Sequence, residues 1–269
     1  MASPVMEAGF RSELIGKELY QIWEQSGVSC FLLVGADRAL LLDTGYGLWD
    51  LRGFVEKLTD KPIMVVNSHG HIDHVGGNWQ FREAYLHPAD FGLTRRHTSE
   101  SERRKAMEFL AVPSPDHLSH GMCPLRAIAP RQRFDLGKRM VEAVPCPGHT
   151  AGSIALFDEE TGIALVGDAL SRHVWLFDED STRVADMSES IRRLQAYDMR
   201  AAYCSHSPER LEPGFFGQLA DFAARVRIEK SAPFAVPLAG TTALIYHEGG
   251  ALFESADFLS IVYTPEKLR

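Results

Sequence analysis

The chain has 269 residues, 45% of them hydrophobic, and a formal net charge of −8. This length and composition suit one large α/β unit with a sizeable core, so we expect a single domain over residues 1–269. No long block of Lys and Arg is present. We therefore expect no nucleic-acid partner, because affinity for phosphate backbones depends on clustered positive charge.

The four cysteines are widely spaced and include no CxxC pair, which favours a reduced intracellular protein. No apolar run approaches the length of a membrane span, and residues 1–4 carry no basic segment followed by an apolar one. We therefore expect a cytoplasmic protein with no membrane partner.

The first part of the chain alternates apolar runs with turn residues. These runs predict strands at residues 14–23, 29–34 and 39–42. Asp43 ends the third strand, and two roles remain open for it: it either accepts the spare N–H of a metal-binding histidine or caps the turn. Apolar residues at helical spacing then predict a helix over residues 48–58.

The densest set of potential metal ligands follows residues 63–66, a β-branched run that predicts a buried strand. Residues 69–74 read His-Gly-His-Ile-Asp-His. In an extended chain His69, His71 and Asp73 point to one side. We expect a helix to begin near Gly76 and to continue through residue 84, which would swing His74 towards the same point. Three imidazoles and a carboxylate suit zinc, iron and similar ions, with room for two.

Residues 84–88 predict the next strand, and His87 at its end is interpreted as a packing or hydrogen-bonding residue. Residues 89–126 are irregular, with a helix that ends before Pro113. A long insertion beside a metal site is a candidate lid. Its basic residues between 95 and 105 either face solvent or hold an acidic group of the substrate.

Further apolar runs predict strands at residues 133–136, 140–144, 154–157, 163–166 and 201–204. Three of these runs lead into another potential ligand. His149 lies in a Pro-Gly-His-Thr-Ala-Gly-Ser loop, Asp168 follows a glycine, and His206 lies between serines. A site built along one edge of a sheet requires this placement. A helix over residues 211–229 and strands at 243–247 and 258–263 complete the chain.

Together, these motifs resemble the metallo-β-lactamase superfamily. The resemblance spans residues 43–206 and rests on the His69-to-His74 motif, the His149 loop, Asp168 and His206. It implies an α/β fold, a four-layer αββα sandwich, with a two-metal site at one edge of the two sheets. It also implies the ligands: His69, His71 and His149 for one ion, Asp73, His74 and His206 for the other, and Asp168 bridging both.

The complete ligand set is similar to that of glyoxalase II, lactonases and phosphodiesterases of the family. It implies a dinuclear metal-dependent hydrolase of a small-molecule ester, thioester or lactone. Two divalent ions, zinc or else iron or manganese, would hold a bridging hydroxide, and a metal brings the pKa of bound water from 15.7 to about 7. Asp73 and Asp168 would fix the geometry, and either could pass a proton. Zinc β-lactamases usually lack the bridging aspartate, which disfavours β-lactam hydrolysis.

Two other classes remain open: a mononuclear iron oxidoreductase of the persulfide dioxygenase kind, and a binding protein with an unproductive site. A phosphodiesterase is a further alternative within the hydrolases. Arg172, His173 and Trp175 follow Asp168 closely and are candidate substrate-binding residues. We interpret Cys146, Cys204 and Tyr203 as core residues. The expected partner is a small molecule, and the sequence does not predict an oligomeric state.

Overall fold

Three β-sheets form the framework of the protein in a computed structural model that describes residues 5–7, 9–111, 121–236, 240–250, 255 and 257–268. The first sheet follows chain order, with antiparallel pairing up to its fifth strand and parallel pairing after it. Its strands are β1 (Val5–Glu7), β2 (Phe10–Gly16), β3 (Leu19–Glu24), β4 (Ser29–Val34), β5 (Ala39–Leu42), β6 (Ile63–Val66), β7 (Ala84–Leu86) and β8 (Leu125–Ala127).

The second sheet faces the first and has the order β14-β12-β11-β10-β9. Its strands are β9 (Arg133–Asp135), β10 (Met140–Pro145), β11 (Ile154–Asp158), β12 (Ile163–Leu165) and β14 (Ala201–Tyr203). The core between the two sheets contains alternate residues of each strand, such as Phe31 and Leu33 of β4 opposite Leu156 of β11. The intervening residues of β4 point outwards, because side chains alternate between the faces of a strand.

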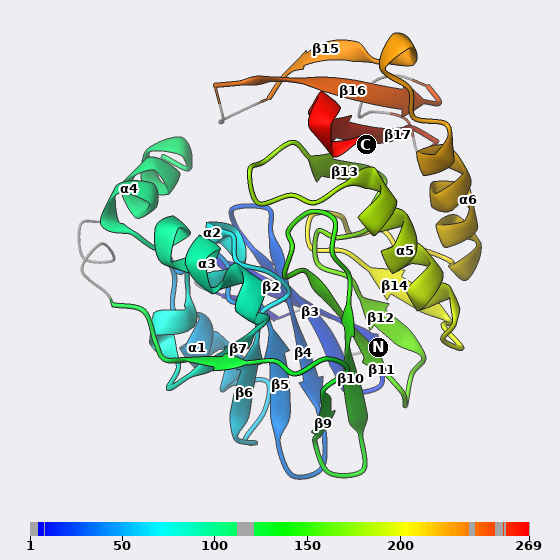
Figure 1. The fold of residues 1–269 in the computed structure, drawn as a ribbon. Helices are drawn as coiled ribbons and strands as arrows, with labels where there is room; N and C mark the ends of the chain where they lie inside the picture. The colour runs from blue at the N-terminus through cyan, green and yellow to red at the C-terminus, as the bar shows by residue number, and fades with distance from the viewer. Residues whose placement is uncertain are drawn as a thin grey trace.

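Helices cover the outer faces of both sheets (Figure 1). The described α-helices are α1 (Leu51–Val55), α2 (Ile72–Val75), α3 (Phe91–His97), α4 (Glu100–Phe109), α5 (Val184–Gln195) and α6 (Pro213–Ala224). Short 3₁₀ turns occupy Asn78–Gln80, Pro88–Asp90, Ile228–Lys230 and Pro265–Lys267. Helix α1 packs on the first sheet, and α5 and α6 pack on the second. The predicted α/β fold with four layers is therefore confirmed.

A third sheet, which the sequence analysis did not predict, lies at the upper end of the molecule in Figure 1. It has the order β13-β17-β16-β15, from β13 (His173–Leu176), β15 (Ala232–Ala235), β16 (Thr242–Glu248) and β17 (Leu259–Tyr263). Only the last two of these strands were predicted. One face of this sheet, including Val174 and Leu176, packs in the same core as α5 and α6.

Several predicted elements were wrong in their bounds. The predicted strand over residues 14–23 is a hairpin of β2 and β3, turned at Glu18, whose φ is +47°. The predicted helix over residues 48–58 is shorter, and the one over 211–229 ends at Ala224. The insertion carries two helices, α3 and α4, and then β8. Residues 112–120 of the candidate lid lie outside the described residues, so the lid remains a prediction.

The helix of the metal motif begins before the glycines. Helix α2 starts at Ile72, and residues 81–84 are not helical, so the prediction of a helix from Gly76 to residue 84 was wrong. The glycines instead allow a close backbone approach. A Cβ at Gly76 or Gly77 would lie 2.3 Å from the carbonyl oxygen of Tyr46 or Thr44, respectively. This approach holds the end of α2 against the loop that follows β5.

Candidate metal centre

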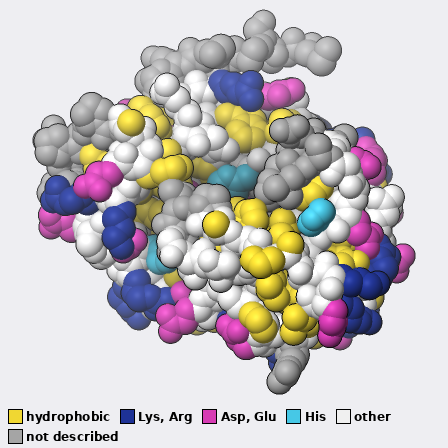
Figure 2. Space-filling view, turned by 90° about the horizontal axis from the view of Figure 1, so that it is seen from above, with side chains coloured by type: hydrophobic (Ala, Val, Ile, Leu, Met, Phe, Trp, Pro, Cys, Tyr) yellow, Lys and Arg dark blue, Asp and Glu magenta, His cyan; other side chains and the backbone are white. Residues whose placement is uncertain are grey.

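All seven predicted ligands meet at one edge of the two facing sheets. His69 and His71 follow β6, and Asp73 and His74 lie on α2. The other three ligands follow strands of the second sheet: His149 after β10, Asp168 after β12 and His206 after β14. Viewed from above, Figure 2 shows a hollow with a histidine side chain at its base and hydrophobic side chains beside it.

The first group consists of His69, His71 and His149, which are all buried. Nδ1 of His71 lies 3.0 Å from Nε2 of His69 and 2.9 Å from Nε2 of His149. Burial, followed by the neighbouring imidazoles, lowers the pKa of His69 and of His71 well below the usual range. These two rings are therefore neutral at physiological pH.

Hydrogen bonds fix which ring nitrogens of this group carry lone pairs. Nδ1 of His149 donates to the carbonyl oxygen of Trp175 over 2.9 Å. Ser68 Oγ donates to the carboxylate of Asp43, so Nδ1 of His69, 3.0 Å from that hydroxyl, must donate to it. Both rings therefore turn Nε2 towards Nδ1 of His71, and in the neutral ring of His69 this nitrogen is an unprotonated acceptor, an arrangement that a cation stabilises.

The second group consists of Asp73, His74, Asp168 and His206. Nε2 of His206 lies 3.1 Å from Oδ2 of Asp73 and 3.2 Å from Oδ2 of Asp168. Nε2 of His74 lies 3.3 and 3.4 Å from the same two oxygens. These four side chains form a network of ion pairs.

Opposite charges, not burial, determine the protonation of this second group. Burial alone would raise the pKa of Asp73 and Asp168, but the imidazoles of His74 and His206 hold both pKa values well below the usual range. Burial would likewise lower the pKa of His206, but Asp168 and Asp73 raise it to about 10. The same carboxylates raise the pKa of His74 well above its usual value against the effect of burial.

Asp168 contacts both groups, because its Oδ2 is also 3.8 Å from Nε2 of His149. Its other oxygen, Oδ1, is buried and has no hydrogen-bond partner among the described residues. A buried polar atom without a partner is costly, so Oδ1 indicates a missing partner. Imidazole nitrogens and carboxylate oxygens suit zinc and related ions. The residues present therefore fit a metal centre.

Asp43 has both roles that the sequence left open. It is fully buried at a φ of +65°, and its Oδ1 accepts the backbone N–H of Ser68 over 2.7 Å. Its Oδ2 accepts Nδ1 of His74 over 2.9 Å and the Ser68 hydroxyl over 2.7 Å. Asp43 thus closes the turn and also orients histidines of both groups.

Asp90 supports the first group and was missed by the sequence analysis. Its buried carboxylate accepts the backbone N–H groups of Gly70 at 3.0 Å and Gly152 at 2.7 Å. It also accepts the Thr150 hydroxyl at 2.6 Å. Asp90 therefore ties the loop of His69 and His71 to the loop of His149. No local pattern marks it, since its partners lie 20 to 62 residues away.

Four other residues around the centre were also missed. The ring of His97 stacks on that of His71, with centroids 4.9 Å apart, and Asp178 Oδ2 lies 4.0 Å from Nε2 of His71. Behind the second group, Glu24 accepts the backbone N–H of Tyr46 over 3.2 Å. Burial, the largest cause, raises the pKa of Glu24 to about 7, and the charge of Asp73 adds to the increase.

The three candidate substrate-binding residues have different surroundings. Arg172 binds Glu209 in a bidentate ion pair of 2.5 and 2.6 Å. Nδ1 of His173 lies 3.3 Å from the Ser260 hydroxyl. The carbonyl oxygen of Trp175 accepts a hydrogen bond from His149. The half-buried ring of Trp175 packs against that of Phe177, with ring centroids 5.3 Å apart. Substrate binding by these three residues stays a prediction.

The residues interpreted as core or structural are confirmed in those roles. Cys146 and Cys204 are buried in the core under α5 and α6, and burial raises the pKa of each thiol to about 12. Such thiols are poor nucleophiles at neutral pH. Tyr203 packs between the two sheets, and Nδ1 of His87 accepts the backbone N–H of Ala89.

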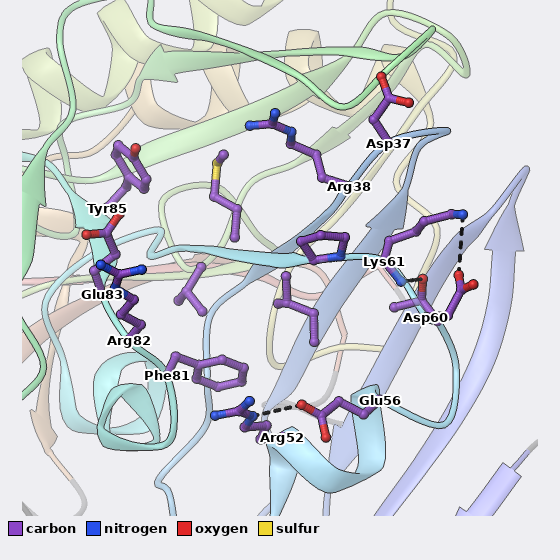
Figure 3. A pocket seen from close by; sticks show the side chains of 15 residues that line it. Asp37, Arg38, Arg52, Glu56, Asp60, Lys61, Phe81, Arg82, Glu83 and Tyr85 are labelled. Carbon is purple, nitrogen blue, oxygen red and sulfur yellow. Dashed lines mark hydrogen bonds and ion pairs between the residues drawn. The ribbon is translucent and has the colours of Figure 1, made fainter.

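A separate pocket of about 800 Å³ lies at the opposite end of β6 (Figure 3). Its charged side chains include the ion pair of Arg52 with Glu56 at 2.8 Å and that of Lys61 with Asp60 at 3.4 Å. The described residues that line it include no histidine or cysteine. This pocket therefore lacks the imidazole and thiolate ligands that a zinc site uses, unlike the metal centre.

Comparisons with known proteins agree with this geometry. The family model described as the metallo-beta-lactamase superfamily matches residues 23–207, more than half of the chain. An acyl-coenzyme A thioesterase, MBLAC2 of Gallus gallus, is 27% identical over 235 residues, which cover 77% of this chain and 80% of that protein. The MBLAC2 of Homo sapiens is 27% identical over 159 residues, or 52% of this chain and 57% of that protein.

Among solved structures, a metallo-beta-lactamase from Pontibacter korlensis superposes with a TM-score of 0.61 at 17% identity. The superposition covers 81% of this chain and 100% of that one. At this identity the likeness concerns the fold alone. In the described part of the chain, no helix has the length and apolar character needed to cross a membrane.

Proposed function

The chain belongs to the metallo-β-lactamase superfamily of metallo-hydrolases. From this we propose that it hydrolyses a small-molecule thioester with the help of two bound divalent ions, and that these ions are zinc. One observation carries the proposal: seven donor side chains lie in two adjoining groups that Asp168 connects. The first group would hold one ion through three imidazoles, and the second would hold the other.

When bound, such ions supply an activated water and a Lewis acid for the substrate carbonyl. The chain's own residues give that chemistry its setting. Asp43 and Asp90 fix the ring orientations and the two ligand loops. Asp73 and Asp168 are ionised, because their pKa values lie well below the usual range. In this ionised form neither carboxylate can act as a general acid at neutral pH.

With both carboxylates ionised, and with His74 and His206 deprotonated when they bind an ion, the centre offers no proton donor to the leaving group, which favours a thioester over an alkyl ester. A thiol has a pKa of about 8.5, so a thiolate departs at neutral pH without first receiving a proton. An alkoxide is far more basic and needs a proton donor as it leaves. The name of the MBLAC2 relatives, acyl-coenzyme A thioesterase, points to the same bond in those proteins.

The test combines elemental analysis with an assay of the acetyl thioester of N-acetylcysteamine, using protein purified without chelators. We expect close to two zinc ions per chain, release of free thiol, and loss of activity in a chelator that returns when zinc is added. One iron per chain with oxygen consumption would instead identify an oxidoreductase of the persulfide dioxygenase kind. Turnover of phosphodiesters without thioesters would also refute the proposal.

A further inference from the structure

The face of the third sheet that turns away from α5 and α6 carries its own small apolar cluster. Val262 of β17 and Ile245 of β16 are buried there and are cross-strand neighbours, and Trp175 of β13 is the next residue in the same row. Phe177 and Phe234 pack against this cluster as well. The three aromatic side chains are only half-buried.

This aromatic surface, formed by Trp175, Phe177 and Phe234, adjoins the three-histidine group. The carbonyl oxygen of Trp175 accepts Nδ1 of His149 over 2.9 Å. Asp178, the residue after Phe177, reaches to 4.0 Å from Nε2 of His71. The segment from Trp175 to Asp178 therefore contacts two histidines of one group, and it carries two of the three aromatic side chains. Figure 1 shows the third sheet at the same end of the molecule as α2 and α3.

We propose that this aromatic surface binds the apolar acyl chain of the substrate, so that the enzyme prefers thioesters of medium-length or longer acyl groups. This inference rests on the proposed function. Partly exposed aromatic rings supported by a packed core offer a rigid apolar surface to a ligand. A whole aromatic side chain has about 150–250 Å², so three partly buried ones expose far less than the roughly 800 Å² per partner of a stable protein interface, and a small apolar group suits them better than a protein.

Rows of aromatic and aliphatic side chains bind alkyl chains without directional contacts. Each methylene that the surface covers contributes up to about a fourfold gain in binding. A polar acyl group would lose its hydration there and gain no hydrogen bond in return. The surface thus discriminates by chain length, while the metal centre acts on the thioester carbonyl of every substrate.

The first experiment compares acetyl, butyryl and octanoyl thioesters of N-acetylcysteamine with zinc-loaded protein. We expect kcat/KM to rise about tenfold or more from acetyl to octanoyl, mainly through KM. In Phe177→Ala the loss grows with chain length and reaches roughly tenfold for the octanoyl substrate. The control is Leu14→Ala, an exposed hydrophobic residue on β2, which should keep the native profile.

A second experiment does not depend on turnover. Metal-free protein is titrated with the decyl thioether of N-acetylcysteamine, which cannot be hydrolysed, and tryptophan fluorescence and calorimetry record binding. We expect binding at least about tenfold tighter than that of the ethyl thioether. The fluorescence change should disappear in Trp175→Phe. If Phe177→Ala fails to fold, this titration with Trp175→Phe still locates the site.

The outcomes separate the two proposals. Acetyl hydrolysis without dependence on chain length, together with equal binding of both thioethers, would refute the acyl surface and leave the thioesterase intact. Preferential decyl binding through Trp175 without hydrolysis of any thioester would refute the thioesterase and keep the apolar surface. A native chain-length profile in Phe177→Ala would place the acyl chain elsewhere.

Discussion

The two groups of the metal centre have opposite protonation, and the difference is clearest between His69 and His74, which are both fully buried. In the three-histidine group, burial lowers the pKa of His69 and His71, and the rings are neutral. In the mixed group, burial acts in the same direction on His74 and His206, but neighbouring carboxylates raise both pKa values. The comparison shows that the type of neighbour, rather than burial, decides the charge of a buried donor.

This difference bears on how each group would receive a cation. The neutral rings of His69 and His71 present lone pairs directly, so protons do not compete for these two donors near neutral pH. Protonated His74 and His206 must first release their protons, although Asp73 and Asp168 attract a cation strongly. The two groups therefore differ in the pH dependence of their affinity for metal, even though they are adjacent.

Removing the one side chain that both groups share should have the largest effect. In Asp168→Ala, we expect thioester hydrolysis to fall by on the order of 10³-fold or more, because charge stabilisation is lost at both groups. Elemental analysis should also show fewer metal ions per chain. The matched control is Asp221→Ala, an exposed aspartate of α6, which should retain activity. Full activity in Asp168→Ala would contradict the two-group site.

The next effect is the pH dependence of metal binding. His206, with a pKa of about 10, is protonated at pH 6 to 8, so the affinity of the mixed group should increase with pH. The slope should be about tenfold per pH unit for each proton released. The three-histidine group should change less over this range, because the pKa values of His69 and His71 lie well below the usual range. Competitive chelator titrations with zinc at pH 6, 7 and 8 measure both affinities, and equal slopes would contradict the comparison.

Changing a residue that orients the ligands should reduce metal affinity less than removing a ligand. Asp90→Asn replaces a carboxylate that can only accept hydrogen bonds. This carboxylate accepts the backbone N–H groups of Gly70 and Gly152 and the hydroxyl of Thr150. We expect the three-histidine group to lose roughly 10- to 100-fold in metal affinity, as for other residues that orient ligands. The mixed group, which Asp90 does not contact through these bonds, should keep its affinity. An equal loss at both groups would indicate general loosening, and Asp221→Asn provides the control.

The sequence predicted the seven donors because chemistry and position agreed locally. Three of the four donors in residues 69–74 are histidines. His149, Asp168 and His206 each follow a predicted strand, so the donors were expected to lie along one edge of a sheet. It could not predict Asp90, His97 or Tyr46, whose contacts with the site depend on tertiary packing. It also placed Asp73 on extended chain, whereas α2 already begins at Ile72.

The fold was predictable where hydrophobic runs were short and separated by turn residues. The hairpin of β2 and β3 was missed because Lys17 and Glu18 carry no glycine or asparagine signal, although Glu18 adopts a positive φ. Helix α5 was missed despite helical spacing of Val184, Met187, Ile191 and Leu194. The third sheet was missed because β13 pairs with β17, and nothing local links strands so far apart in the chain.

The last effect concerns stability rather than metal binding and arises at Glu24, a buried acid without the cationic neighbours that Asp73 has. Its pKa of about 7 in the folded chain exceeds the ordinary value of 4.5. Between these values the unfolded state binds fewer protons than the folded state, so stability falls as pH rises and the loss is complete above pH 7. The expected loss is about 2–3 kcal/mol between pH 5 and pH 8 in metal-free protein.

Glu24→Gln should remove this dependence, since an amide does not titrate. Its NH₂ group would replace Oε1, which is buried without a hydrogen-bond partner, so the variant carries a cost at every pH. The informative quantity is therefore the change in the free energy of unfolding from pH 5 to pH 8, measured with urea. That change should be smaller in the variant than in the native chain. Equal changes would show that Glu24 is already ionised in the folded state and that the environment behind the mixed group is more polar than its burial indicates.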